Sequence, residues 1–271
     1  MKRIGILYHP KIEAAAAFAQ EMAQYIPSLG ASCWLCSAWD EEEARARAQD
    51  ADLILSIGGD GTILRAARAV IPAPVAIVGI NLGRLGFMTE LTSGEAREKL
   101  PALLAGEGWI DERAMVQARL ASEETFYALN DIVVGRGAIA RVVYLRVTID
   151  GAPLTTYKAD GVIVATATGS TGYCLAAGGP IIYPQGREMV LKPISPHPTF
   201  DNALVLPETA VVGLEVGTDH QAVLSVDGQV DLALESGQGV WVCQSPYVAR
   251  FLRIREPAFF YTTLMERLRQ R

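Results

Sequence analysis

The sequence predicts an α/β domain followed by an all-β domain, with a final helix that returns to the first domain. In the first part of the chain, apolar strand-like runs alternate with helical patterns, which is typical of a parallel sheet with helices between its strands. From about Trp109 the helical periodicity disappears, and short alternating runs of apolar and polar residues take its place. We therefore place one domain at residues 1–108 with 252–271 and the other at 109–251.

The first domain is predicted to be Rossmann-like, because its strands and helices alternate in the order of a parallel sheet. The acidic run Asp40–Glu43 suits the start of a helix, where carboxylates meet the positive end of the helix dipole. Ser93 is expected to cap a later helix through its side-chain oxygen. The predicted elements are strands at 3–8, 32–37, 53–57 and 75–80, and helices at 14–26, from 40, from 62 to near 72, and at 93–104.

The second domain is predicted to be a β-sandwich of two packed sheets. The dipeptides Asp150-Gly151 and Asp227-Gly228 are typical of tight hairpin turns. The chain ends with an amphipathic stretch, Thr262 to Arg271, which we expect to form the returning helix. The predicted strands lie at 116–120, 126–129, 142–149, 161–165, 210–216, 222–226 and 240–242.

Composition limits the classes of partner. The chain has 271 residues and a net charge of −6 without a basic run, which argues against nucleic acid and anionic membranes. No apolar run reaches the roughly 18 residues of a membrane span, and the N-terminus leads into a strand rather than a signal peptide, so we expect a cytoplasmic protein. Cys33 and Cys36 point to opposite faces of a predicted strand, so we interpret the four cysteines as buried thiols.

A glycine-rich turn between a strand and a helix is the first candidate site. In Gly58-Gly59-Asp60-Gly61-Thr62, the backbone N–H groups and the helix start can cradle phosphates. The charge of Asp60 would repel phosphate, so we interpret this residue as a base or as a partner of a metal that carries the phosphates. The alternative is that Asp60 is only the N-cap of the helix. The turn is neither a P-loop nor a dinucleotide fingerprint.

Three further polar stretches follow predicted strands. The loop Asn81–Thr89 holds two glycines three apart, which indicates either a loop packed closely on its neighbours or a plain turn. Thr166–Tyr173 is dense in hydroxyls and glycines, which favour a polar ligand over a core, although a hydroxyl-rich surface loop is the alternative. Asp160 and the pair Asn130-Asp131 offer acceptors for a ribose or an amide. The three histidines leave little for a His-dependent mechanism, and we interpret them as structural.

The order and rough spacing of these motifs resemble the NAD kinases over nearly the whole chain, from Ile4 to Gln229. The first motif is shared with diacylglycerol and sphingosine kinases and, more loosely, with phosphofructokinases, whereas the second and fourth are much more specific. The matching motifs are Gly58-Gly59-Asp60-Gly61-Thr62, Asn81-x-Gly83-x-Leu85-Gly86-Phe87, Leu129-Asn130-Asp131, and Asp160-Gly161 through Gly169-Ser170-Thr171 to Gly178-Gly179-Pro180.

The resemblance implies a role for each matching position. Asp60 would be the general base toward the 2′-hydroxyl of the adenosine ribose of NAD, with Gly61 beside it. Asn130 and Asp131 would hold the ribose and nicotinamide side, and Asp160 the carboxamide region. The pocket for adenine and ribose would be lined by Thr171, Gly172, Tyr173, Cys174, Leu175, Ala176 and Gln229, with further ligand contacts from Arg65, Arg141, Lys158 and Thr168.

The resemblance also implies the reaction and its partners. NAD would be phosphorylated to NADP with ATP or polyphosphate as donor and Mg²⁺ or Mn²⁺ as the metal, in a homodimer or homotetramer. The site would lie between the two domains. The chain has Asp131 where the family often has Glu, and Gly172 where it usually has Ala, which affects affinity rather than the reaction. A lipid kinase and a non-catalytic nucleotide sensor are the alternatives.

Overall fold

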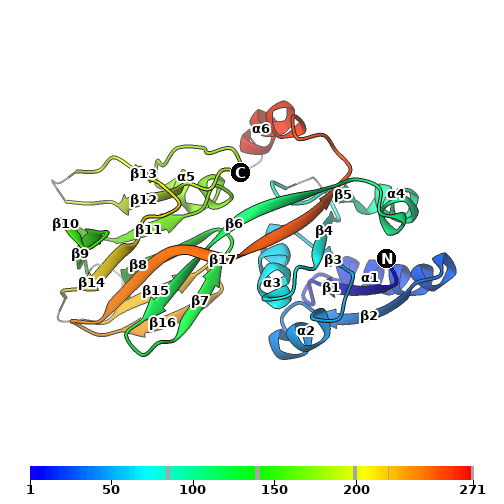
Figure 1. Ribbon diagram of the computed structural model, residues 1–271, viewed down its shortest axis with the longest axis horizontal. Helices are drawn as coiled ribbons and strands as arrows, with labels where there is room; N and C mark the ends of the chain where they lie inside the picture. Colours follow the sequence, from blue (N-terminus) through cyan, green and yellow to red (C-terminus); the bar gives the residue numbers. More distant parts are fainter. Residues whose placement is uncertain (84–85, 138–140, 198–199, 219, 270–271) are drawn as a thin grey trace. The chain divides into compact units, whose positions relative to one another are not determined.

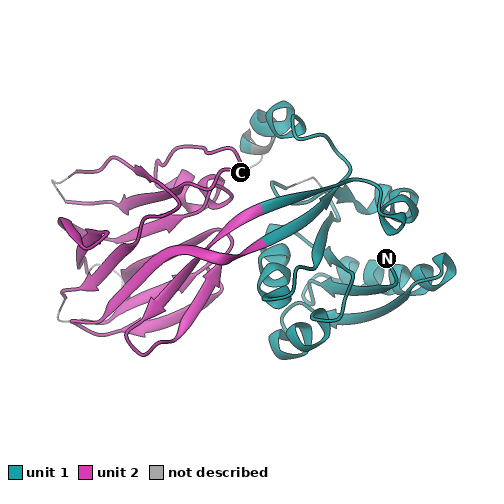
Figure 2. Cartoon of the chain, viewed as in Figure 1, with its two compact units in different colours: residues 1–112, 249–271 teal, residues 113–248 magenta. Residues whose placement is uncertain are grey.

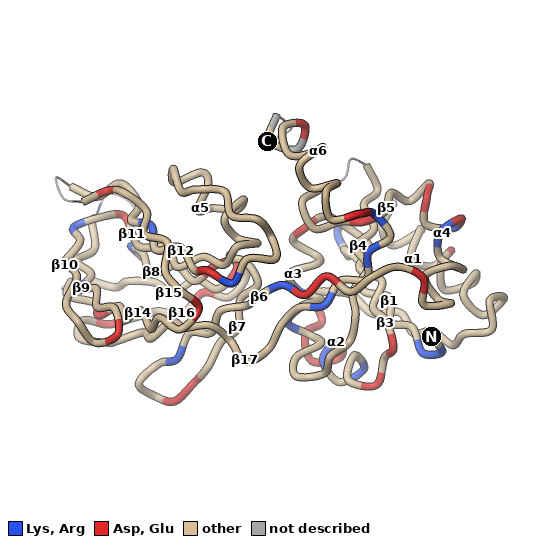
Figure 3. Tube along the Cα trace, turned by 45° about the horizontal axis from the view of Figure 1, so that its top comes forward, with Lys and Arg blue, Asp and Glu red and all other residues tan. Residues whose placement is uncertain are grey.

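The computed structural model describes residues 1–83, 86–137, 141–197, 200–218 and 220–269. Figure 2 shows the chain as two compact units, residues 1–112 with 249–271 (unit 1) and residues 113–248 (unit 2). The predicted division into domains at 108/109 and 251/252 stays a prediction. Positive and negative residues occur along both units (Figure 3).

Unit 1 is a parallel sheet with helices, in the strand order β17-β4-β3-β1-β2, and β5 also pairs with β4. All five residues of β3 are buried, as expected for a central parallel strand covered on both faces. Figure 1 shows the elements, which are β1 (Arg3–Tyr8), α1 (Glu13–Tyr25), η1 (Ile26–Leu29), β2 (Ser32–Ser37), α2 (Glu41–Ala48), β3 (Leu53–Ile57), α3 (Asp60–Val70), β4 (Ala76–Asn81), β5 (Leu91–Thr92), α4 (Ser93–Ala105), the end of β17 (Gly239–Arg253) and α6 (Phe259–Arg269).

Side-chain caps set the starts of two helices in unit 1. The carboxylate of Asp40 accepts a hydrogen bond from the backbone N–H of Glu43 at 3.2 Å and begins α2, as the acidic run predicted. The N-cap of α4 is Thr92, so the prediction of Ser93 as the cap is wrong. Thr92 and Glu95 bond to each other's backbone N–H in a capping box, which satisfies two donors where Ser93 would satisfy one.

Unit 2 is a β-sandwich with a shared core. One sheet has the order β13-β12-β11-β8-β15-β16, and the other runs β10-β9-β14-β17, with β6 paired to β7. Apolar residues of both sheets, such as Val134 and Val147, pack in one buried cluster. The elements are β6 (Trp109–Leu120), β7 (Thr125–Ala128), β8 (Asp131–Arg136), β9 (Val143–Ile149), β10 (Ala152–Ala159), β11 (Gly161–Ala165), η2 (Gly169–Thr171), α5 (Tyr173–Ala176), β12 (Met189–Ile194), β13 (Leu204–Leu206), β14 (Val212–Val216), β15 (Ala222–Val226) and β16 (Val230–Leu234).

Alternation along β8 separates the core of the sandwich from a second face. Ile132 and Val134 belong to the core between the sheets. Val133 belongs instead to a small cluster with Ile163 and Cys174, on the other side of the six-stranded sheet. This outer face carries α5 and, as described below, the polar residues of the candidate site.

The two predicted Asp-Gly hairpin turns are confirmed. Both residues of Asp150-Gly151 and of Asp227-Gly228 have positive φ, between 52° and 80°, as a two-residue hairpin turn requires. All four cysteines are free, but only Cys36 and Cys174 are buried, so the prediction of buried thiols is wrong for the half-buried Cys33 and Cys243. In the described ranges, no helix has the length and apolarity to cross a bilayer.

Candidate functional site

Asp60 is held at the start of α3 by a loop from further along unit 1. Its Oδ2 accepts a hydrogen bond from the backbone N–H of Phe87 at 3.0 Å, and its Oδ1 accepts one from Met88 at 3.1 Å. The N-cap of α3 is Gly59, and no side chain caps this helix. The alternative in which Asp60 is an N-cap is therefore wrong. Its half-buried carboxylate is fixed in place by two donors that lie 27 and 28 residues away in sequence.

Gly86 lets this loop approach Asp60. A Cβ on Gly86 would lie 2.4 Å from Oδ1 of Asp60, a distance that real contacts do not reach. The N–H of Gly86 bonds to the hydroxyl of Thr89 at 2.6 Å, which fixes the turn that presents the next two N–H groups. The predicted close packing of the loop Asn81–Thr89 holds for these residues, and positions 84 and 85 lie outside the described residues.

The glycine turn itself needs glycine at one position above all. Gly58 has φ of 151°, and a Cβ there would lie 2.3 Å from Oγ1 of Thr62. Thr62 is buried against this turn, whereas Gly61 is exposed and Gly59 half-buried. The predicted phosphate-cradling loop therefore presents Gly59, Asp60 and Gly61 to its surroundings, with Thr62 as support underneath.

Unit 2 carries the second group of predicted residues, organised by an aspartate that the sequence analysis missed. The carboxylate of Asp227 accepts hydrogen bonds from the backbone N–H groups of Leu129, Asn130 and Asp131 at 3.0, 2.7 and 3.1 Å. Its own N–H donates to the carbonyl of Asp131 at 3.0 Å. From the sequence, Asp227 was predicted only as part of a hairpin turn, because the pattern Asp-Gly already accounts for an aspartate at this position. In the fold it sets the backbone of the Asn130-Asp131 pair.

Burial makes Asp131 a weak acid. Its side chain is 5% exposed, and burial together with the nearby charge of Asp227 raises its pKa from 3.8 to about 7. Between these two pH values the folded protein keeps this proton and the unfolded chain releases it, so this group lowers stability as the pH rises.

We expect Asp131→Asn to remove this pH dependence. Since the raised pKa makes the free energy of unfolding fall between about pH 4 and pH 7, the variant gains stability relative to the wild type as the pH rises through that window. Urea unfolding at four pH values across the window measures the difference. If the free energies of unfolding of the two proteins changed in parallel with pH, Asp131 would not be a buried residue that keeps its proton.

Two neighbouring cavities lie on the outer face of the six-stranded sheet. The first, about 350 Å³, is lined by Asn130, Asp131, Tyr173 and Asp227 among others. The second, about 250 Å³, contains Asp160, whose carboxylate pairs with Arg136 at 3.0 Å. Val133, Tyr173 and Ser225 line both cavities, so the two form one continuous surface. Arg136 is a further residue of this surface that the sequence analysis did not name.

The hydroxyl-rich loop is built differently from the prediction. Thr166, Ser170 and Thr171 are buried, and each donates its hydroxyl hydrogen to a backbone carbonyl, those of Leu129, Ala167 and Thr168. These groups therefore hold the loop in shape rather than lie open to a cavity. Thr168 is also buried and accepts from Arg113 at 3.4 Å.

The remaining predicted residues lie at different depths. The thiol of Cys174 is in the small apolar cluster, and burial raises its pKa to about 11. Gly172 lies next to two residues of the first cavity, because a Cβ there would be 3.6 Å from Nδ2 of Asn130 and 3.7 Å from Oδ2 of Asp131. The others are Gln229 in the turn after β15, half-buried Leu175, exposed Ala176, Lys158 and Arg141, and Arg65 of unit 1. The ligand contacts of all these residues stay predictions.

The described residues do not build a metal cage. No three His, Cys, Asp or Glu side chains among them lie close enough to hold an ion. Mg²⁺ commonly keeps most of its waters and is bound through substrate phosphates with one or two carboxylates.

Comparison with known proteins agrees with the fold and motifs. The family model of the ATP-NAD kinase N-terminal domain matches residues 11–108, and that of the C-terminal domain matches 129–254. An NAD kinase of Dehalococcoides mccartyi is 45% identical over 273 residues, covering 99% of this chain and 96% of the relative. An NAD kinase of Chloroflexus aurantiacus is 41% identical over 276 residues, covering 100% and 99%.

Solved structures share the fold at lower identity. The yeast NADH kinase complexed with NADH matches with a TM-score of 0.84 at 24% identity, covering 99% of this chain and 87% of that one. An NAD kinase from Archaeoglobus fulgidus in complex with ATP matches with a TM-score of 0.82 at 24% identity, covering 99% of both chains. With family models on both parts of the chain and relatives above 40% identity along its length, the chain belongs to the NAD kinase family of enzymes.

Proposed function

We propose that the chain transfers a phosphoryl group to the 2′-hydroxyl of the adenosine ribose of NAD, giving NADP, with Asp60 as the general base. The observation that carries the proposal is the fixed carboxylate of Asp60 directly after the glycine turn. A carboxylate offers about four acceptor positions. The N–H groups of Phe87 and Met88 occupy one on each oxygen, so each oxygen keeps a position for the ribose hydroxyl.

The chemistry asked of Asp60 is a single proton transfer. As the ribose oxygen bonds to the phosphorus of the donor, its proton passes to the carboxylate, and the bond from phosphorus to the donor's bridging oxygen breaks. The two backbone donors keep the carboxylate from rotating away before the hydroxyl arrives. Positioning of this kind is the main contribution that a protein makes to phosphoryl transfer.

Unit 2 supplies the groups that recognise the nucleoside. Asn130 and Asp131 present an amide and a carboxyl group to a cavity of about 350 Å³, suited to ribose hydroxyls. Asp160 in the adjoining cavity can accept from an amide such as the nicotinamide carboxamide. Since Tyr173 lines both cavities, an extended dinucleotide can occupy them together.

We propose ATP or polyphosphate as the phosphoryl donor. The divalent metal would be bound to the phosphates of the donor. The Archaeoglobus fulgidus relative is described with ATP, which supports ATP here. Mg²⁺ or Mn²⁺ arriving with the phosphates would offset their charge, since the described residues form no cage for it. A cytoplasmic homodimer or homotetramer remains the proposed state of the enzyme.

The test is a direct assay. The purified chain is incubated with NAD, Mg²⁺ and either ATP or polyphosphate, and NADP is measured by a coupled dehydrogenase. We expect NADP with at least one donor and none without a donor. Absence of NADP with both donors and with either metal would overturn the proposal.

A further inference from the structure

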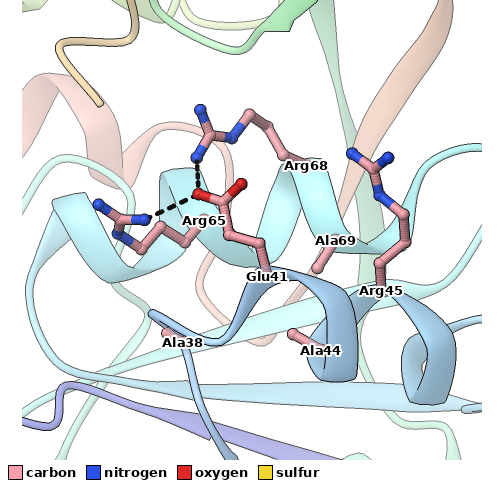
Figure 4. Close-up of a pocket in the computed structure, with 7 residues that line it drawn as sticks. All are labelled: Ala38, Glu41, Ala44, Arg45, Arg65, Arg68 and Ala69. Carbon is pink, nitrogen blue, oxygen red and sulfur yellow. Dashed lines mark hydrogen bonds and ion pairs between the residues drawn. The ribbon is translucent and has the colours of Figure 1, made fainter. Parts of the chain in front are cut away.

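A pocket rich in arginine lies between α2 and α3 of unit 1. Its polar side chains are Arg45, Arg65, Arg68 and Glu41, and alanines 38, 44 and 69 complete the wall. Figure 4 shows Arg65 and Arg68 of α3 converging on one carboxylate oxygen of Glu41, with Arg45 of α2 alongside. The two distances to that oxygen, Oε1, are 2.9 Å from Arg65 and 2.8 Å from Arg68. We call this set the arginine pocket.

The arginine pocket carries more positive charge than its own acid neutralises. Three guanidinium groups and one carboxylate line the pocket, and Arg68 is only 9% exposed. Nη1 of Arg68 and Nε of Arg65 are buried without a hydrogen-bond partner. Buried charged donors that lack acceptors are costly, so the pocket calls for a further anion. In keeping with this, burial and the charge of Arg68 lower the pKa of Arg65.

A series of contacting side chains connects the arginine pocket to the glycine turn at Gly58. The guanidinium of Arg65 lies over the ring of Trp39, 4.3 Å from its centroid, and the ring of Trp39 contacts that of His9 in a tilted arrangement with 4.3 Å between the centroids. His9 in turn contacts the turn, because a Cβ on Gly58 would lie 3.3 Å from the Cβ of His9. These contacts hold the guanidinium of Arg65 in a fixed orientation, and a preorganised guanidinium binds oxyanions well.

We propose that the arginine pocket binds a phosphate group and that Glu41 is an internal anion that the phosphate displaces. The remaining hollow is about 10 Å³, room for about one water, so an anion enters only if the carboxylate leaves. The side chain of Glu41 is 51% exposed and can turn into solvent without breaking packing. A phosphate offers more acceptors than a carboxylate and can satisfy both orphaned nitrogens.

The phosphate group can belong to free inorganic phosphate or to a nucleotide. Arg65 is also one of the ligand contacts that the resemblance implies, but no step of the proposed NAD phosphorylation uses Arg68 or Glu41, so the inference goes beyond the proposed function. It is tested by calorimetric titration of the full chain with inorganic phosphate and, separately, with ATP, at constant ionic strength. The variants are Glu41→Gln and Arg68→Gln, with Glu43→Gln as the matched control, since Glu43 pairs with Arg47 at 2.7 Å on the same helix outside the pocket.

We expect Glu41→Gln to bind phosphate about three- to tenfold more tightly, because the competing carboxylate is gone. Arg68→Gln should weaken binding at least about tenfold, and Glu43→Gln should leave it unchanged. If Arg68→Gln does not fold, Arg45→Gln at the exposed rim should weaken binding about two- to fivefold. The same pattern with ATP identifies a nucleotide phosphate, and a response to inorganic phosphate alone identifies the free ion.

Two results would overturn the inference. One is a Glu41→Gln protein that binds phosphate no more tightly than the wild type. The other is a folded Arg68→Gln protein whose phosphate affinity is unchanged, which would place any observed binding elsewhere, for example at the glycine turn. Neither result bears on NADP formation, so the proposed function stands or falls separately by its own assay.

Discussion

Asp60→Asn lowers the rate constant for NADP formation by at least about 10²-fold, the usual contribution of a positioned general base. The substitution keeps the size of the side chain but removes its charge and its capacity to take a proton. It also places an amide nitrogen against one of the N–H groups of Phe87 and Met88, which costs about 1–2 kcal/mol of stability. Single-turnover kinetics measure the rate constant, a urea melt measures the stability, and calorimetry measures the binding of NAD.

The control for this prediction is Asp40→Asn. Asp40 caps α2 by accepting from the N–H of Glu43, and Asn caps helices about as well as Asp. This variant should match the wild type in rate and lie within about 0.5 kcal/mol in stability. Near-normal turnover in Asp60→Asn would end the assignment of Asp60 as the base and leave its carboxylate a role in holding the loop.

Asp227→Asn raises the KM for NAD about tenfold or more and destabilises the protein by about 1–3 kcal/mol. One carboxylate satisfies three backbone N–H groups, and an amide cannot accept from all of them. The backbone of Asn130 and Asp131 then shifts within the first cavity. Because the charge of Asp227 helps to raise the pKa of Asp131, the variant should also lower that pKa and flatten the pH dependence of stability described above.

Asp150→Asn is the matched control for Asp227→Asn. Asp150 also has positive φ in an Asp-Gly turn of unit 2, but its carboxylate accepts from one N–H, that of Val211 at 2.9 Å. The KM for NAD should be unchanged in this variant. Equal effects of the two substitutions would show that Asp227 acts only as a turn residue, and an unchanged KM in Asp227→Asn would show that it does not position the Asn130-Asp131 pair.

The sequence predicted some strands of unit 2 with their bounds and missed others. The predicted strands at 161–165 and 222–226 coincide with β11 and β15. By contrast β10 was missed, because it is an edge strand with few buried residues. The buried strand β12 was also missed, because Lys192 and Pro193 interrupt its run of apolar residues. The ammonium group of Lys192 is tolerated there because it donates to Asp201, a partner that no local pattern reveals.

The site was predicted by residue type but not by how its residues are held. Asp60 belongs to a motif that can be recognised in the sequence. The N–H groups of Phe87 and Met88, which bond to its carboxylate, come from a loop that only the fold brings near. The hydroxyls of Thr166 and Ser170 find their acceptors in backbone carbonyls, and that cannot be read from composition. Interactions over long sequence separations therefore account for most of what was missed.

The alternation along β8 restricts how the length of this chain can vary. Since Ile132 and Val134 fill the core while Asp131, Val133 and Gly135 meet the cavities, deleting or inserting one residue in β8 would exchange the two sets. Asp131 and Gly135 would then enter the core of the sandwich, and Ile132 and Val134 would face the cavities. We therefore expect β8 to keep its length in related chains, and insertions or deletions to occur in exposed turns such as Asp150-Gly151, where a change of length leaves the strand register unchanged.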